Sequence, residues 1–199
     1  MARAPVAGRV KTRLARGVGT SEALRFYRTV SRSVIARLSR QPFWETIIAA
    51  TPDADRLSRV WPKHVRRIGQ GGGDLCARMQ RPMRILPPGP VCIIGTDIPD
   101  IDPGHIRRAF RALGRRDAVF GPATDGGFWL VGLRRRPHVI EPYRKKPIRW
   151  SHADTLADVI ANLEHHSIGY TTTLADIDDA NDLAQRTARP TRLIKPPAP

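Results

Sequence analysis

Short apolar runs alternate with amphipathic segments along most of the chain. Short apolar or β-branched runs, typical of buried strands, lie at residues 46–51, 91–96, 118–121, 128–133 and 168–172, and residues 65–68, which end at Gly69, are a further strand candidate. Apolar residues recur at helical spacing at residues 21–38, 74–86, 102–113 and 151–163. This alternation predicts an α/β domain with a mainly parallel sheet and helices on both faces. Ligands of such sheets bind at the carboxyl ends of the strands, so we expect the functional residues there.

Local signals mark where the predicted helices begin. Thr20 is the expected N-cap of the first helix, and Asp102 with Pro103 is expected to start the third. Ser151 and Asp154 have the spacing of a capping box at the start of the fourth. The segment at residues 8–19 is expected to be a loop that ends in a glycine-containing turn.

The chain of 199 residues is expected to form one domain at residues 1–189, followed by a proline-rich tail at residues 190–199 that cannot join the sheet. It contains no apolar run of about 18 residues, and its start lacks the apolar core of a signal peptide. A cytoplasmic location is therefore expected. Its two cysteines, Cys76 and Cys92, lack the spacing of metal ligands and are expected to be reduced and buried.

The formal net charge is +16, which favours nucleic acid, an anionic membrane or a phosphorylated small substrate. The basic residues are mostly arginine and are scattered, and clusters such as residues 134–136 are expected to be solvated loops. No motif of a nucleic-acid-binding protein accompanies the charge. A solvated basic surface is thus preferred, and a nucleic-acid-binding protein is the alternative from another functional class.

Basic residues alternate near the start of the chain, where Arg9, Lys11 and Arg13 follow Gly8. Arginine side chains match the geometry of phosphate oxygens, and backbone N–H groups can add to such a cradle. The segment is therefore a candidate site for a diphosphate or triphosphate. In a chain so rich in arginine, a solvated loop is the alternative.

Asp97 directly follows the apolar run at residues 91–96. A carboxylate at the end of a buried strand can hold a hard cation such as Mg²⁺ that also contacts phosphates. The alternative is a cap of the turn that contains Pro99 and Asp100.

Two glycine-containing segments are further candidates. Residues 69–75 lie between a predicted strand and a predicted helix, so their N–H groups could bind an anion or a base, although the segment matches neither a Walker nor a dinucleotide motif. Residues 121–127 contain Asp125, Gly126 and Gly127, which form either an ordinary hairpin turn or a close approach for a sugar.

Acidic residues cluster near the end of the predicted domain, in a chain that is otherwise basic. They are Asp176, Asp178, Asp179 and Asp182. One interpretation is a second metal ligand beside Asp97. The other is that these carboxylates pair with arginines or cap a short helix that starts near Asp179.

Taken in order, several motifs resemble a bacterial family of GT-A-type, nucleotide-diphospho-sugar-transferase-like proteins. They are GRVKTRL at 8–14, QGGGDL at 70–75, GTDIP at 95–99, FGPATDGG at 120–127, WS at 150–151 and DID at 176–178. The resemblance covers about residues 2–183. The segments at 11–14 and 176–178 are also similar to the 2-phospho-L-lactate and molybdenum-cofactor guanylyltransferases.

The resemblance implies a Rossmann-like GT-A domain with Mg²⁺ or Mn²⁺, and glycosyl transfer from a nucleotide-diphospho-sugar. Transfer of a nucleotidyl group from an NTP, with release of pyrophosphate, is the alternative. The implied nucleotide-binding residues are Gly8, Arg9, Lys11, Arg13, Gln70, Gly71, Gly73 and Asp74. The implied metal ligands are Asp97 with Asp176 or Asp178, and the candidate catalytic residues are Asp97 and Asp125. The residues implied to face the sugar or acceptor are Gly126, Gly127, Trp150 and Ser151.

The start of the chain differs from the resemblance. Such proteins usually begin with an apolar strand that leads into the phosphate-binding loop, whereas residues 1–5 here already correspond to the loop. The first strand either lies upstream or is truncated. If it is missing, we expect the sheet to lack a central strand.

Overall fold

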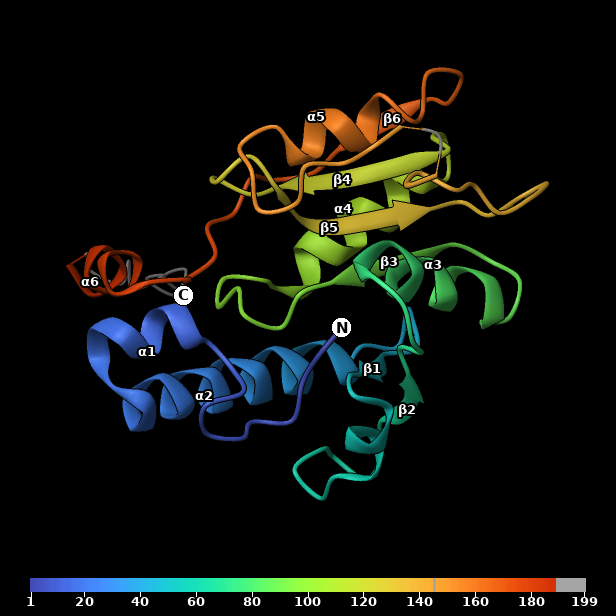
Figure 1. Cartoon of the computed structure of the whole chain (residues 1–199). Coiled ribbons are helices and arrows are strands. Elements are labelled where there is room, and N and C mark those ends of the chain that lie inside the picture. The colour runs from blue at the N-terminus through green and yellow to red at the C-terminus, as the bar shows by residue number, and fades with distance from the viewer. Residues whose placement is uncertain (145, 189–199) are drawn as a thin grey trace, which may run out of the picture.

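The computed structural model of the protein describes residues 1–144 and 146–188 (Figure 1). The helices are α1 (Thr12–Val18), α2 (Thr20–Ser39), α3 (Leu75–Ile85), α4 (Pro103–Leu113), α5 (Thr155–Ile160) and α6 (Ala180–Ala188), with a 3₁₀ turn η1 (Asp53–Leu57). The strands are β1 (Ile47–Ala50), β2 (Arg66–Gly69), β3 (Val91–Ile94), β4 (Ala118–Pro122), β5 (Phe128–Leu133) and β6 (Ile168–Tyr170). The predicted proline-rich tail at residues 190–199 lies outside the described residues.

The strands form two sheets. β1 and β2 pair in parallel, and the larger sheet has the order β3-β5-β4-β6. β5 is antiparallel to both neighbours, because β4 and β5 form a hairpin, while β4 and β6 are parallel. The predicted α/β class is confirmed, and the hairpin interpretation of residues 121–127 accounts for the antiparallel pairs.

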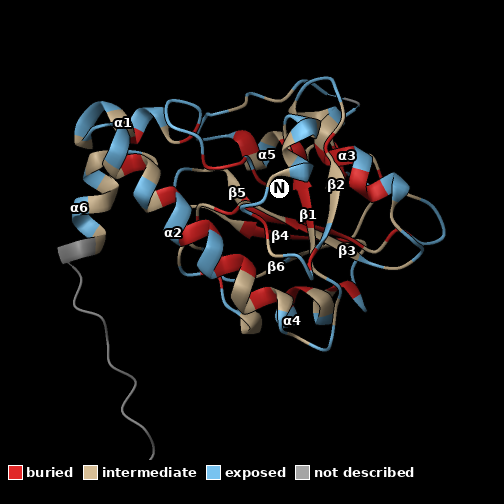
Figure 2. Cartoon of the chain, turned by 90° about the horizontal axis from the view of Figure 1, so that it is seen from below, coloured by how far each residue is buried: buried red, intermediate tan, exposed pale blue. Residues whose placement is uncertain are grey.

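Helices cover both faces of the larger sheet, as predicted. On one face, α2 and α4 pack their apolar stripes together over β5, with Val34, Ile106 and Leu130 among the buried residues. On the other face, α3 and α5 pack on β4 and β5, with Met83 and Val159 near Phe120. Figure 2 shows the larger sheet and the inward faces of these helices as buried. Packing on both faces therefore holds the ends of the strands in fixed positions, and the loops that follow these ends can form a site.

The ends of the helices follow the predictions in part. Asp102 caps α4 in a reciprocal capping box with His105. Thr20 is instead the first residue of α2, and Gly19 precedes it without a side-chain cap. The predicted box of Ser151 and Asp154 is wrong, because Asp154 makes no side-chain cap and the Thr155 hydroxyl accepts the N–H of His152 at 3.2 Å.

Two further predictions for basic segments are wrong. Residues 12–18 form α1 instead of a loop, because the fully buried Leu14 anchors the segment to the core. Arg135, expected in a solvated loop, is 8% exposed and donates hydrogen bonds to the carbonyls of Leu86, Pro87 and Gly89. Arg135 therefore holds the loop before β3 in place.

Helices within the described ranges are all too short or too polar to cross a membrane. Both cysteines are free and half-buried.

Candidate nucleotide-binding site

A pocket of about 490 Å³ lies where the carboxyl ends of β1, β2 and β3 meet the start of the chain. Thr51, Gln70 and Gly95 come directly after these strands and line it. Its polar lining also includes Arg3, Arg9, Lys11, Arg13, Tyr27, Arg78, Thr96, Asp97 and Asp178. Residues that are far apart in the sequence thus meet at the edge of the sheets where a ligand was expected.

Lys11 lies between two carboxylates of this pocket. Its Nζ atom is 3.0 Å from Oδ2 of Asp97 and 2.5 Å from Oδ1 of Asp178. The side chain of Lys11 is only 6% exposed, whereas those of Asp97 and Asp178 are 35% and 41% exposed. The ammonium is therefore largely shielded from solvent, and each carboxylate keeps an accessible side.

The backbone explains how these three side chains converge. Lys11 has left-handed dihedral angles, with φ of 47° and ψ of 48°, and directly precedes α1. Asp97 follows β3, and Asp178 precedes α6. α6 packs closely on α1, since a Cβ atom added to Gly17 would lie 2.6 Å from the Cβ of Ala180. This close packing of two helices brings Asp178 to Lys11.

The charges in the pocket keep the Lys11 ammonium protonated. Burial, the largest single influence, lowers the pKa of Lys11, but the attraction of Asp97 and Asp178 outweighs it. The pKa of Lys11 consequently lies above its usual value. One cation is thus shared by two carboxylates in the floor of the pocket.

Arginines surround this ammonium. Arg9 and Arg13 are exposed, and Nη1 of Arg13 is 3.8 Å from Oδ2 of Asp178. Arg3 and Arg78 also line the pocket, although no motif in the sequence points to them. The one available signal for Arg78 was its position in the first turn of the helix that follows the glycine-rich segment. Because the chain has 34 basic residues, this signal could not be separated from the background.

Tyr27 fixes the start of the chain at the pocket. Its hydroxyl accepts the N–H of Arg3 and donates to the carbonyl of Arg3, both at 3.1 Å, and lies 3.4 Å from Oγ1 of Thr96. Burial raises the pKa of Tyr27, so the hydroxyl keeps its proton. Tyr27 is a buried position of α2 that the periodicity predicted as core, and its polar role could not be inferred from spacing.

The glycine-rich segment at residues 69–75 contributes mainly to structure. The buried amide of Gln70 lines the pocket but donates to the carbonyl of Ala49 at 2.8 Å. The N–H of Gly71 donates to Oδ1 of Asp53 at 2.9 Å, and Asp74 caps α3 by accepting the N–H of Ala77 at 2.8 Å. The structure does not place Gly71, Gly73 or Asp74 in the lining of the pocket. Gly8 lies on the exposed loop with φ of 73° and is also outside the lining.

The hairpin at residues 123–127 and the turn before α5 lie against each other. The carbonyl of Gly126 accepts the N–H of Leu156 at 3.0 Å, and a Cβ atom on Gly126 would be 1.9 Å from the carbonyl oxygen of Ala153. Asp125 accepts the N–H of Gly127 at 2.9 Å, which tightens the hairpin. The structure therefore brings this hairpin next to the turn at residues 150–154, although neither lines the 490 Å³ pocket.

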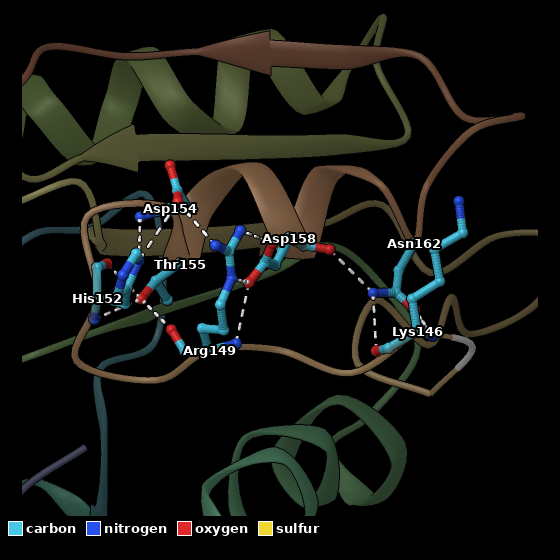
Figure 3. Close-up of polar contacts among 7 residues, drawn as sticks. All are labelled: Lys146, Arg149, His152, Asp154, Thr155, Asp158 and Asn162. Carbon is cyan, nitrogen blue, oxygen red and sulfur yellow. Dashed lines mark hydrogen bonds and ion pairs between the residues drawn. The ribbon is translucent and has the colours of Figure 1, made fainter.

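A polar network holds that turn (Figure 3). Arg149 forms an ion pair with Asp158 at 2.7 Å and another with Asp154 at 2.9 Å, and the Thr155 hydroxyl donates to the carbonyl of Arg149 at 2.7 Å. Between these anchors, the ring of Trp150 packs 6.4 Å from that of Phe128, measured between centroids. Ser151 is exposed in a left-handed conformation with φ of 57°. Trp150 and Ser151 are thus held on a fixed turn beside the hairpin.

Asp176 connects the two regions electrostatically. Burial, together with the nearby carboxylates of Asp178 and Asp125, raises the pKa of Asp176 to about 6. Over residues 1–144 and 146–188, no three His, Cys, Asp or Glu side chains are grouped to hold a metal ion. The structure brings Asp97 and Asp178 together at Lys11. Asp176 interacts through its charge with Asp178, Asp125 and Lys11.

The two remaining acids of the cluster cap α6. Asp179 accepts the N–H of Asp182 at 3.0 Å, and Asp182 accepts the N–H groups of Asp178 and Asp179 at 2.8 and 3.0 Å. The capping interpretation therefore holds for Asp179 and Asp182, whereas Asp178 pairs with Lys11.

Comparisons with known proteins agree with this architecture. The family described as "Uncharacterized protein conserved in bacteria (DUF2064)" matches residues 34–152. The chain is also similar to a crystal structure from Desulfovibrio desulfuricans G20 that is described as a "putative nucleotide-diphospho-sugar transferase", with 27% identity and a TM-score of 0.81 over 96% of this chain and 86% of that chain. A search of curated proteins gave no match. The GT-A-like fold is thereby confirmed, and the likeness to guanylyltransferases stays a prediction.

Proposed function

The chain belongs to the bacterial DUF2064 family, and from this premise we propose that it is a transferase whose donor is a nucleotide-diphospho-sugar. In the proposal, the diphosphate of the donor binds in the pocket around Lys11. The charges of that pocket support it, as does the similarity to the Desulfovibrio desulfuricans structure.

The observation that carries the proposal is the excess of cations in the pocket, whose lining has Arg3, Arg9, Lys11, Arg13 and Arg78 against Asp97 and Asp178. Lys11 is already paired with both carboxylates, so the arginines of the lining supply the net positive charge that attracts an anion. Arg9 and Arg13 are exposed beside Lys11, where they can form charge-assisted hydrogen bonds to phosphate oxygens. A diphosphate is long enough to contact several of these cations at once.

A bound Mg²⁺ or Mn²⁺ ion is part of the proposal. The carboxylates of Asp97 and Asp178 approach one atom, Nζ of Lys11, within 3.0 Å, so they are arranged to face a single cation. Mg²⁺ is commonly held by one or two carboxylates together with phosphate oxygens, and these two residues fit that pattern. When bound, the metal would offset the negative charge that develops on the leaving diphosphate.

The chain's own residues have separate roles in this proposal. Lys11, Arg9 and Arg13 bind the diphosphate and stabilise its growing charge as the sugar leaves. The hairpin with Asp125 and the neighbouring turn with Trp150 hold the acceptor or the sugar. Asp125 is exposed at the hairpin tip and is the proposed group that accepts the acceptor's proton.

A thermal-shift screen of nucleoside diphosphates and nucleotide sugars, with and without Mg²⁺ or Mn²⁺, tests the proposal. A ligand at 100 times its dissociation constant stabilises the folded state by about 2.7 kcal/mol, which is a clear shift of the melting temperature. We expect such a shift with the nucleotide and metal together. Nucleoside, free sugar and metal alone are the controls.

Asp97→Asn should remove the metal-dependent part of this shift, because a neutral amide is a poor ligand for a hard cation. The matched control is Asp100→Asn, since Asp100 lies outside the pocket lining and accepts a hydrogen bond from Arg186 at 2.6 Å. An equal response of both variants would mean that Asp97 only caps its turn. Stabilisation by NTPs and pyrophosphate, but not by nucleotide sugars, would favour nucleotidyl transfer.

A further inference from the structure

The loop between β1 and β2 projects from the molecule. It contains the 3₁₀ turn η1 and extends away from the larger sheet (Figure 1). After η1 it makes two consecutive turns, at residues 58–61 and 62–65, which are closed by backbone hydrogen bonds of 3.5 and 3.2 Å. The last residues of these turns, Trp61 and Val65, are each 4% exposed and pack with Ile48 of β1 in the core. These two anchors hold the residues between them at the surface in a defined arrangement.

Apolar and basic side chains are combined at the end of this loop. Leu57 and Val60 are 74% and 41% exposed. Arg56, Arg59 and Lys63 are exposed next to them along the chain. We call these five residues the loop tip. A single exposed leucine needs no explanation, whereas two exposed apolar side chains and three cations on one projecting segment indicate a surface that binds something.

The two acidic residues of the loop are directed at the body of the protein. Within residues 51–67 they are Asp53 and Asp55. Oδ1 of Asp53 accepts the N–H of Gly71 at 2.9 Å, and Oδ2 of Asp55 accepts the N–H of Ala4 at 3.0 Å. The loop tip therefore presents apolar groups and positive charge without an acidic residue of its own loop beside them.

The same two hydrogen bonds connect the loop to the pocket around Lys11. Ala4 follows Arg3 and Gly71 follows Gln70, and both Arg3 and Gln70 line that pocket. None of the five residues of the loop tip lines it. A surface that binds the loop tip would thus lie at a fixed distance from the pocket and would leave the pocket open.

We propose that the loop tip docks the protein on an anionic lipid bilayer, with its two apolar side chains at the boundary between headgroups and acyl chains and its three cations among the lipid headgroups. Charge complementarity selects this partner, because an anionic bilayer offers negative charge at its surface and an apolar layer directly beneath it. Nucleic acid would match the cations but not the apolar pair. A projecting tip also suits a fluid bilayer, which can close around it.

Co-sedimentation with lipid vesicles tests the proposal. One set of vesicles is phosphatidylcholine alone, and the other contains about one-quarter phosphatidylglycerol, both at about 0.15 M salt. We expect the protein to bind the anionic vesicles at least about tenfold more tightly than the neutral ones. Because the net charge of +16 itself attracts anionic vesicles, the decisive variants keep that charge.

Leu57→Ser with Val60→Ser removes the apolar pair and leaves the net charge unchanged. Its affinity for the anionic vesicles should fall by roughly tenfold or more, because two apolar side chains no longer leave water on binding. The matched control is Ile85→Ser with Tyr170→Ser, which changes two residues outside the loop that are 49% and 57% exposed. The control should bind like the wild type. Equal vesicle binding by the two double variants would overturn the proposal.

A second pair of variants distinguishes a membrane from nucleic acid. Arg59→Gln with Lys63→Gln should weaken binding to the anionic vesicles by roughly tenfold or more, since basic residues near a charged bilayer each contribute to affinity. Arg107→Gln with Arg111→Gln, which removes two exposed charges from α4, should stay within about twofold of the wild type. Binding of duplex DNA is measured with the same proteins. If loss of the loop charges weakens DNA and vesicle binding alike while removal of the apolar pair affects neither, the loop tip is a nucleic-acid surface and the membrane proposal is wrong.

Discussion

Lys11 is the shared counter-ion of Asp97 and Asp178, so its replacement should affect both stability and metal binding. In Lys11→Met the two carboxylates face each other without a counter-ion. Because both are partly exposed, we expect a loss of about 1–3 kcal/mol in the free energy of unfolding at pH 7. We also expect Mn²⁺ to stabilise Lys11→Met more than the wild type, since the ammonium no longer competes for the same oxygens.

Urea unfolding with and without Mn²⁺ measures both effects, and Lys63→Met is the control, because Lys63 is exposed and outside the pocket. If Lys63→Met and Lys11→Met respond alike, the central place given to the Lys11 ammonium is wrong.

Asp176 should make stability depend on pH in the mildly acidic range. Its pKa is about 6 in the folded protein and near 3.8 in the unfolded chain, so between these values the folded state binds the additional proton. The contribution of Asp176 to the free energy of unfolding should therefore fall as the pH rises from about 4 to 6. Asp176→Asn should raise the melting temperature at pH 7.5 and bring little gain at pH 4. An equal rise in the melting temperature at both pH values would show that the charge of Asp176 does not cause the stabilisation.

The packing of α6 on α1 gives a prediction at the scale of secondary structure. Alanine in place of glycine inside a helix normally adds up to about 1 kcal/mol of stability. At Gly17 the new Cβ atom would lie 2.6 Å from that of Ala180, so we expect Gly17→Ala to destabilise instead, by about 1–2 kcal/mol net. Hydrogen exchange in α6 should become faster, because the helix is displaced.

The control for Gly17→Ala is Gly72→Ala, where an added Cβ atom meets nothing within 4 Å and φ is not positive. Urea unfolding measures the free energy of unfolding of both variants. A stability gain in Gly17→Ala would mean that the two helices are not in close contact.

Elements with a clear period could be predicted from the sequence, and the others depended on contacts between distant residues. The run at residues 91–96 and the stripe of α2 predict β3 (Val91–Ile94) and α2 correctly, because a continuous apolar run and a 3.6-residue period are local signals. α1 is short and basic, and its helical form depends on the burial of Leu14. The sequence therefore predicted a loop there.

In the candidate site, too, only the residues marked by local patterns could be predicted from the sequence. Asp97 was selected because it follows a buried strand, and Lys11 because basic residues alternate around it, which are both local patterns. The convergence of Asp178 on Lys11 requires the contact between α1 and α6, and the role of Asp74 as a cap depends on where α3 begins. Neither could be derived from spacing alone. Whether Gln70, Asp125 and Trp150 contact a ligand stays a prediction.

At the scale of the whole molecule, the net charge of +16 is divided between a pocket and a general surface. We expect the basic residues at the pocket, and not those elsewhere on the surface, to determine nucleotide affinity. A nucleic-acid-binding protein would instead respond to total charge, and its binding would fall steeply with salt whichever basic residues were removed. The two hypotheses therefore differ in whether ligand affinity depends on the position of the basic residues or on their total number.

Calorimetric titration of a nucleoside diphosphate with Mn²⁺ into two double variants tests most directly whether this pocket binds the phosphates of the nucleotide. Arg9→Ala with Arg13→Ala removes two charges at the pocket, and Arg59→Ala with Lys63→Ala removes two exposed charges outside it. Each lost charged hydrogen bond costs roughly 1.5–3 kcal/mol, so we expect the pocket variant to bind at least about tenfold more weakly. The control should stay within about 0.5 kcal/mol of the wild type. Equal losses in the two double variants would contradict the assignment of this pocket to the nucleotide's phosphates.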